Sequence, residues 1–334
     1  MKYLRFLTIF CLTAVLAFSV SCKKDDDDSN TKQYLSGTIE FDFPSYVRYG
    51  DVIHVSPTGV YKGDDKADSL VGYRWVNPFT EKTDTLRRES DPASKGKEFD
   101  FVISKDSLAT FTLILSAWAD GYYEKTANAT FTIVNPILGT GSLKGYDFLA
   151  SIPSFTDSRD GQKYYYNTVG GKDWMIQNLA WNGAGIAYED DEAISDVFGR
   201  FYTWSEAASA CPSGWHLPSN AEFKALAEAV AGKEDNAAGA LMVDATFNGD
   251  RLWEFWPDVK ITNQSRFSAI PLGYAMVEGA SASFRAYKEY AMFWTADASG
   301  ADMGIARYIY VDKPAFFSGE YGKESLRANV RCVR

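Results

Sequence analysis

The chain has 334 residues, of which 46% are hydrophobic and 23% charged, a composition typical of a globular protein with room for two domains. This excludes a disordered chain, a collagen-like repeat and a polytopic membrane protein. Acidic residues number 44 against 34 Lys and Arg, and the net charge of −10 would repel nucleic-acid phosphates. With only two histidines, His54 and His216, a metal site built from several histidines is excluded. We expect no cofactor and no nucleic-acid partner.

Residues 1–21 have the pattern of an export signal. Lys2 and Arg5 precede an apolar run, Phe6 to Val20, that is too short to span a bilayer comfortably. The segment Ser19-Val20-Ser21-Cys22 resembles a bacterial lipobox, with Ser19 where Leu is usual. This resemblance implies that Cys22 is the lipidated first residue of the mature protein.

Residues 22–33 are expected to form an acidic tether. Lys23 and Lys24 are followed by four aspartates, Asp25 to Asp28, and an acidic run in this position resembles the surface-export signal of Bacteroidetes lipoproteins. We therefore expect an outer-membrane lipoprotein that faces the cell exterior and contacts the membrane only through its acyl chains. The alternative is a cleaved secretory signal followed by a solvated acidic spacer.

The remaining cysteines fit an exported protein. Cys11 lies in the signal and Cys22 carries the lipid, which leaves Cys211 and Cys332. Outside the cytoplasm a disulfide between them is the default, and two buried free thiols are the alternative.

Residues 34–135 are predicted to form an all-β sandwich. Short apolar or alternating runs recur between turn signals, as in such sandwiches, and we expect Trp75 on a central strand, facing the opposite sheet. The pattern resembles immunoglobulin-like and PKD-like modules of exported lipoproteins, in the role of a spacer. The predicted strands are Gly37 to Phe43, Val52 to Val55, Val71 to Val76, Phe99 to Ile103, Thr110 to Trp118 and Ala127 to Val134. Residues 136–156, rich in Gly, Ser and Pro, are expected to be a flexible linker.

Residues 157–334 carry several ordered sequence blocks. They begin with Asp160-Gly161-Gln162 and Trp174-Met175-Ile176-Gln177-Asn178-Leu179, continue through Cys211-Pro212-Ser213-Gly214-Trp215-His216-Leu217-Pro218, and close with Val330-Arg331-Cys332-Val333-Arg334. This pattern resembles the Fibrobacter succinogenes major paralogous domain. The resemblance implies a C-type lectin-like α+β fold, related to that of the formylglycine-generating enzyme, and it implies no defined activity.

Two helices are predicted in this region. Ser219 and Glu222 form a capping box for a helix that Gly232 ends, and a shorter helix is expected from Thr203 to Ala210. We interpret His216 as a hydrogen-bonded structural residue, because a lone base without a nucleophile or an orienting acid does not make a catalytic triad.

Calcium-dependent sugar binding is not expected. The Glu-Pro-Asn or Gln-Pro-Asp signature of C-type lectins is absent, and Trp181-Asn182-Gly183 only partly matches the accompanying Trp-Asn-Asp. Glu189 to Glu192 could supply oxygen ligands for calcium, but an exposed acidic loop is the better interpretation.

A calcium-free aromatic surface is the favoured binding site. Trp181, Trp253 and Trp256 are its candidate residues, because flat amphipathic rings suit sugars or protein partners. The alternative is that these rings fill the core. Glu254 and Asp258 are not supported as a hydrolase pair, because closeness in sequence does not establish the carboxylate separation that such a pair needs.

Three functions follow from these observations. The favoured hypothesis is a non-catalytic, lipid-anchored surface protein whose lectin-like domain binds an extracellular glycan or protein. A structural or adhesin-like subunit of a surface assembly is the second, and an enzyme that modifies glycan or protein is the third.

Overall fold

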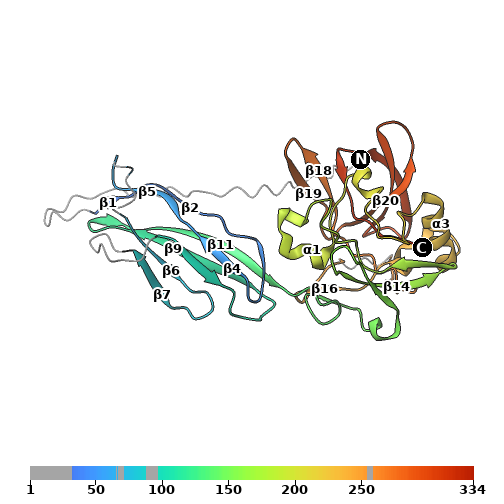
Figure 1. Cartoon of the computed structure of the whole chain (residues 1–334), viewed down its shortest axis with the longest axis horizontal. Coiled ribbons are helices and arrows are strands. Elements are labelled where there is room, and N and C mark those ends of the chain that lie inside the picture. Colours follow the sequence, from blue (N-terminus) through green and yellow to red (C-terminus); the bar gives the residue numbers. More distant parts are fainter. Residues whose placement is uncertain (1–31, 65, 67–70, 88–96, 254–258) are drawn as a thin grey trace, which may run out of the picture.

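The computed structural model describes residues 32–64, 66, 71–87, 97–253 and 259–334, so the predicted signal and most of the predicted tether, including Cys22, lie outside the described residues. The fold is mostly β, with several small sheets in two units (Figure 1). In the part of the chain that the structure describes, none of the helices has the length and apolar character needed to cross a bilayer.

The N-terminal unit consists of strands. Its largest sheet has the order β3-β11-β9-β6-β7, and β2-β5, β4-β8 and β1-β10 form two-stranded sheets. The strands are β1 (Gln33–Tyr34), β2 (Ser36–Glu40), β3 (Tyr46–Arg48), β4 (Val52–Val55), β5 (Thr58–Tyr61), β6 (Gly72–Val76), β7 (Thr83–Arg87), β8 (Phe99–Val102), β9 (Thr110–Trp118), β10 (Tyr122–Tyr123) and β11 (Lys125–Val134).

Trp75 joins the two layers of this unit, as the sequence predicts. Strand β6 lies inside the large sheet, and the Trp75 ring stacks on Phe99 at 4.8 Å and meets Phe101 edge-on, both from β8 of the facing pair. All six predicted strands are present. The predictions for β4 and β9 match at both ends, the other four have shifted ends, and β1, β3, β5, β7 and β10 were not predicted from the sequence. These five strands have two to five residues each, which is too short to show a clear alternation.

The C-terminal unit surrounds its core with short helices and four three-stranded sheets, ordered β12-β16-β17, β13-β14-β15, β19-β18-β23 and β20-β21-β22. The strands are β12 (Leu143–Lys144), β13 (Ser154–Thr156), β14 (Lys163–Val169), β15 (Lys172–Met175), β16 (Thr246–Phe247), β17 (Asp250–Arg251), β18 (Tyr274–Glu278), β19 (Ser281–Arg285), β20 (Tyr290–Ala298), β21 (Met303–Tyr310), β22 (Phe316–Gly322) and β23 (Leu326–Arg327). The helices are η2 (Leu149–Ser151), η3 (Tyr188–Asp190), α1 (Glu192–Phe198), α2 (Trp204–Ala207), α3 (Asn220–Ala231), η4 (Glu234–Asn236) and α4 (Ala238–Leu241).

The segment at 136–156 is not the flexible linker that its composition suggests. Ser142, Leu143 and Tyr146 are buried, and β12 pairs with β16 of the C-terminal unit. The Gly and Ser residues here serve tight turns around buried side chains, so the segment is an ordered part of the C-terminal unit.

Local signals fix the predicted helices. Ser219 caps α3 in a complete capping box with Glu222, and Gly232 ends it in the left-handed conformation at φ 74°. A second capping box, between Thr203 and Glu206, starts α2, which ends at Ala207 and is therefore shorter than expected.

The last residues of the chain join three parts of the C-terminal unit. Val333 bridges to both Trp174 and His216, and Cys332 forms the predicted disulfide with Cys211. The Arg334 guanidinium lies over the Trp215 ring at 4.6 Å and donates to the Asp173 carboxylate at 3.1 Å.

Strand β3 connects the two units. The Tyr46 backbone N–H donates to the Asp191 carboxylate at 2.7 Å, and Arg48 pairs with Asp196 of α1 at 2.7 Å. The Tyr46 ring also meets the Tyr188 ring edge-on. These contacts hold α1 against the end of the N-terminal unit.

Removing the disulfide should destabilise the fold. The bridge closes a sequence separation of 121 residues, so replacing both cysteines (Cys211→Ser and Cys332→Ser) should lower the free energy of unfolding by about 4–5 kcal/mol in the chain-entropy model. Urea denaturation at neutral pH measures this difference, and wild-type protein reduced while unfolded should match the double variant. Equal unfolding midpoints for the oxidised wild type and the variant would contradict the prediction.

The capping box should make stability depend on pH. Burial favours a higher pKa for Glu222, but hydrogen bonds from the Ser219 backbone, His216 and Lys172 outweigh it and lower the pKa to about 2. Because the folded pKa is depressed, ionised Glu222 stabilises the fold fully above its ordinary value of 4.5, and this contribution disappears as the pH falls to about 2.

Glu222→Gln should therefore be less stable than the wild type near neutral pH, with the difference shrinking during acidification. Urea midpoints measured at several pH values test this, with Glu228→Gln on the exposed part of the same helix as the control. A difference that stays constant from neutral pH to pH 2 would contradict it.

Candidate functional site

The structure does not place the three candidate tryptophans on one common surface. Trp253 is fully buried, and its indole N–H donates to the Ala269 carbonyl at 3.0 Å, so its predicted role on a ligand-binding surface is wrong and it is a core residue. Trp181 is partly exposed, with the Arg159 guanidinium 4.2 Å from its ring centre, and Asp157 holds that guanidinium in place. Trp256, together with Glu254 and Asp258, lies outside the described residues.

His216 belongs to the cap of helix α3. Its Nε2 lies 3.0 Å from the Glu222 carboxylate, which also accepts from Lys172 at 2.9 Å. Its backbone pairs with Val333. These contacts support the interpretation of His216 as a structural residue that fixes the start of α3.

The acidic stretch at 189–192 is not a simple exposed loop. Glu189 and Asp190 are exposed on η3, but Asp191 is buried, caps helix α1 and accepts the Tyr46 N–H, while Glu192 begins α1 and pairs with Arg200. Burial raises the pKa of Asp191. Helix capping explains why Asp191 is not part of an exposed loop as expected, because its carboxylate satisfies the free N–H of Ala193.

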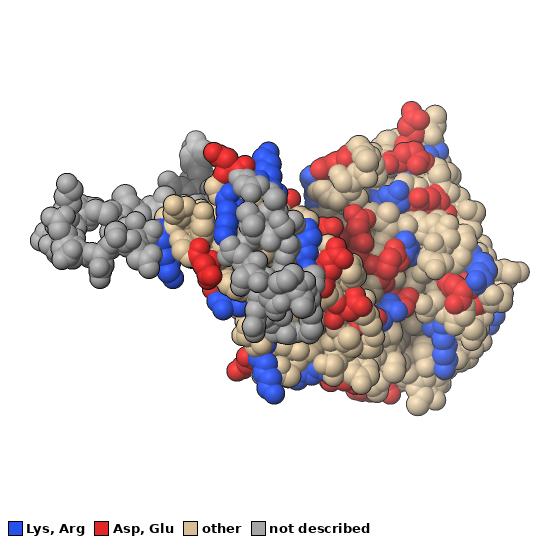
Figure 2. Space-filling model, turned by 60° about the vertical axis from the view of Figure 1, so that its left-hand side comes forward, with Lys and Arg blue, Asp and Glu red and all other residues tan. Residues whose placement is uncertain are grey.

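These carboxylates line a cleft of about 430 Å³ between the two units, next to Asp51. Figure 2 shows acidic side chains gathered beside this junction. Among the described residues, no group of three or more His, Cys, Asp or Glu side chains has an arrangement that could hold a metal ion. The buried carboxylate in the cleft instead joins the two units.

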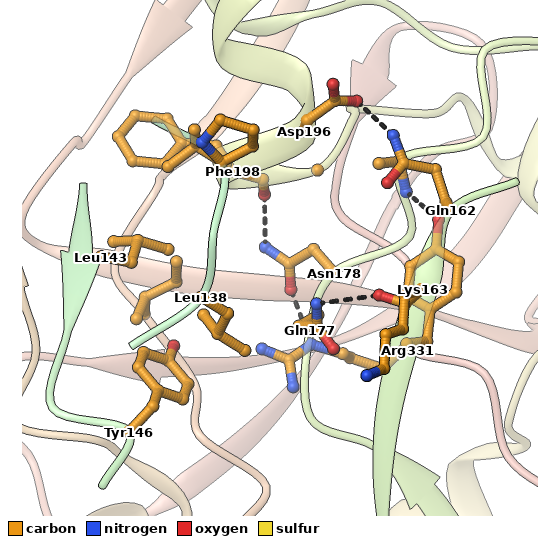
Figure 3. A pocket seen from close by; sticks show the side chains of 16 residues that line it. Leu138, Leu143, Tyr146, Gln162, Lys163, Gln177, Asn178, Asp196, Phe198 and Arg331 are labelled. Carbon is orange, nitrogen blue, oxygen red and sulfur yellow. Dashed lines mark hydrogen bonds between the residues drawn. The ribbon is translucent and has the colours of Figure 1, made fainter. Parts of the chain in front are cut away.

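A small internal cavity lies beneath strand β14 and the segment at 136–146. Figure 3 shows Asn178 between Phe198, whose carbonyl accepts from it at 2.9 Å, and Arg331, which donates to it at 2.6 Å. Tyr146, Leu143 and Leu138 close the opposite side. The cavity measures about 20 Å³, which holds about one water molecule. It is therefore a packing feature and not a ligand site.

The strongest candidate for a binding site is an aromatic surface on the sheet β20-β21-β22. Five partly exposed rings of this sheet form it, joined by Tyr274 from β18 and Trp204 from α2, and we call this set the tyrosine face. Its residues are Trp204, Tyr274, Tyr290, Tyr308, Tyr310, Phe317 and Tyr321.

Strand register explains how the rings come together. Tyr290 lies opposite Tyr310, and Tyr308 lies opposite Phe317, so these side chains share one face of the sheet. The Tyr290 and Tyr310 rings stack at 4.6 Å, and those of Tyr308 and Phe317 at 5.2 Å. Tyr321 pairs with Gly304 and continues the face toward the other end of β21.

Glycine allows Trp204 to join this face. Position 304 alternates with 306 and 308, so a Cβ at Gly304 would point to the same side as Tyr308 and would collide with the Trp204 ring. The Trp204 indole N–H donates to the Thr295 carbonyl at 2.9 Å, which fixes the orientation of the ring.

The tyrosine face ends at an open pocket. The pocket measures about 530 Å³ and is lined by Trp204, Met303 and Lys323, by the carboxylates Asp302 and Glu324, and by small residues. Lys323 lies over the Trp204 ring at 4.4 Å and donates to the carbonyls of Gly300 and Ala301. The pocket therefore offers an aromatic wall and fixed polar groups beside it, the combination typical of small-molecule sites.

Two hydroxyl groups of this face, those of Tyr321 and Tyr290, are held in their protonated form by their surroundings. Burial raises the pKa of Tyr321 to about 12, helped by the neighbouring Tyr308, and burial also raises the pKa of Tyr290. A protonated phenol both donates and accepts hydrogen bonds, so the face combines apolar rings with neutral polar groups. That combination suits an uncharged polyhydroxyl ligand.

Sequence reasoning missed the tyrosine face because it followed tryptophans. The available signal was alternation: Tyr308 and Tyr310 are two residues apart on one strand, and Phe317 and Tyr321 are four apart on the next. The register between those strands could not be obtained from the sequence alone.

Comparison with known proteins identifies the family of the C-terminal part of the chain. A profile of the Fibrobacter succinogenes major domain (Fib_succ_major) matches residues 168–334, which is half of the chain. A search of curated proteins found no match. The matched region contains the whole C-terminal unit from β15 onward, with α3 and the disulfide. It includes every residue of the tyrosine face. The chain therefore belongs to the Fibrobacter succinogenes major domain family.

Proposed function

We propose that this chain is an exported, lipid-anchored protein of the outer cell surface that binds an extracellular glycan through the tyrosine face. In this proposal Cys22 carries the acyl chains, the N-terminal unit is an Ig-like or PKD-like spacer, and the C-terminal unit is a C-type lectin-like domain. The role is binding rather than catalysis.

The observation that carries this proposal is the continuity of the aromatic rings. Several partly exposed rings lie along one sheet face and lead to the pocket at Trp204. The C–H groups of a sugar pack on aromatic faces, and its hydroxyls need neutral donors and acceptors, both of which tyrosine supplies. Binding through these groups requires no metal ion.

A glycan is favoured over a protein ligand by the chemistry of the face. The seven rings of the face are uncharged. The charged side chains lie in the pocket at one end of the face, where Lys323, Asp302 and Glu324 supply hydrogen-bond donors and acceptors that sugar hydroxyls can use. Protein-binding surfaces commonly contain arginine among their anchor residues. A neutral tyrosine-rich surface is better matched to a neutral sugar chain.

Substitution of Tyr308 should test the proposal. Tyr308 lies at the centre of the face, with Tyr290 at 5.8 Å and Phe317 at 5.2 Å. A broad glycan panel first identifies the glycan that the wild-type chain binds. Tyr308→Ala should weaken the affinity for that glycan by about tenfold. Tyr308→Phe, which keeps the ring, should lose less affinity. Tyr49→Ala is the matched control, because Tyr49 is an exposed tyrosine of the N-terminal unit.

The panel is screened with calcium and with chelator, and the thermal midpoint of every variant is measured. Binding that resists chelator, is weakened by Tyr308→Ala and is unaffected by Tyr49→Ala would support the proposal. Binding lost in chelator would contradict a calcium-free site, and binding insensitive to Tyr308 and Trp204 substitutions would exclude the tyrosine face. If no glycan binds, a structural role is favoured, and cross-linking on intact cells would identify the neighbouring proteins.

A further inference from the structure

A second exposed aromatic group lies at the opposite end of the molecule. Tyr34 of β1 and Tyr123 of β10 are paired in register, and their rings stack at 4.9 Å. The two residues are 76% and 47% exposed, which is unusual for stacked rings. Figure 1 shows β1 at the end of the N-terminal unit that is remote from the C-terminal unit.

Lysine side chains accompany these rings. The Lys32 ammonium group lies 5.9 Å from the centre of the Tyr123 ring. That of Lys62 lies 5.6 Å from the centre of the Tyr122 ring, which also packs on the core of the N-terminal unit. We call Lys32, Tyr34, Lys62, Tyr122 and Tyr123 the aromatic tip. Tyrosine with lysine is the composition of the interfacial zone of membranes, where rings lie at headgroup level and ammonium groups meet lipid phosphates.

The position of the aromatic tip in the chain indicates that the membrane surface is its binding partner. Only nine residues separate Cys22 from Lys32, and a chain of that length spans at most about 35 Å even when fully extended. If Cys22 carries acyl chains, the tip is therefore the described surface nearest in sequence to the membrane. An exposed tyrosine such as Tyr49 lies farther along the chain, and no lysine is paired with its ring among the described contacts.

We infer that the aromatic tip docks on the lipid headgroup surface of the membrane that carries the anchor. The stacked rings enter the interfacial layer, and the two lysines contact lipid phosphates. This contact adds a second attachment point to the acyl chains and sets the long axis of the molecule away from the membrane. The inference rests on the proposed lipidation of Cys22.

Quenching by labelled lipids tests the docking directly. The lipidated chain is inserted into vesicles of phosphatidylethanolamine and phosphatidylglycerol that contain a headgroup-nitroxide lipid, with a fluorophore on Gln33→Cys. We expect severalfold stronger quenching there than for a fluorophore on Ser299→Cys, an exposed position of the C-terminal unit. Adding Tyr34→Ser and Tyr123→Ser should reduce quenching at position 33 to the level at position 299, whereas Tyr49→Ser should not change it.

The possible results distinguish a failure of the proposed docking from a failure of the proposed lipid anchor. A mass spectrum of the N-terminal peptide shows whether Cys22 is acylated. With the acyl chains present, equal quenching at positions 33 and 299 would overturn the docking. Quenching that survives the tyrosine substitutions would also overturn it.

If Cys22 is not acylated, the proposed anchor fails, and flotation of Cys22→Ser chains with the same vesicles then decides the docking. Flotation that Tyr34→Ser and Tyr123→Ser reduce about fivefold would support the aromatic tip. The docking would be overturned if the Cys22→Ser chain floats equally well with and without the two tyrosine substitutions. It would also be overturned if neither of these two chains floats with the vesicles. If the lipid nitroxide does not quench the fluorophore and the tip cross-links to an envelope protein, the aromatic tip is a protein interface and the docking on lipid is overturned.

Discussion

The C-terminal unit depends on a buried guanidinium group that has no carboxylate partner among the residues that the structure describes. Arg331 is 1% exposed, and it donates to Asn178 and to the carbonyls of Met175, Phe267 and Ser268. Burial lowers its pKa to about 9, so the side chain stays charged at neutral pH. A buried charge is tolerated only when its hydrogen bonds are satisfied, so all of these oxygens must be in place together.

This requirement determines how the surrounding segments pack. The carbonyls come from the end of β15 and from the loop before β18, while the Arg331 guanidinium also lies over the rings of Phe267 and Phe293. The next residue, Cys332, is covalently joined to the end of the α2 region. The closing residues therefore hold in position the segments that support the sheet β20-β21-β22. The tyrosine face is a surface of that sheet, so its geometry follows from the packing around Arg331.

Local features of this fold could be predicted from the sequence, and features that need two distant segments could not. The capping box of Ser219 and Glu222 is encoded within four residues, and the strand that carries Trp75 shows its own alternation. By contrast, Asp191 meets Tyr46 across 145 residues. Its local role as the cap of α1 does not reveal that it is also buried against the N-terminal unit. The residues Trp253 to Trp256 illustrate the same limit: their crowding suggests that some ring is exposed but does not say which, and Trp253 lies in the core.

Parallel strand pairing at both ends of the N-terminal unit has a mechanical consequence. Strand β1 runs parallel to β10, and β3 runs parallel to the end of β11, which continues into the C-terminal unit. If the proposed lipid anchor holds the N-terminus and the C-terminal unit holds its proposed ligand, a force between them pulls β1 and β10 in opposite directions along their shared axis. The hydrogen bonds between them then bear the tension together and do not open one at a time. The contacts of β3 with α1 carry the same tension across the junction, so the pairing of these strands opposes extension of the N-terminal unit along its length.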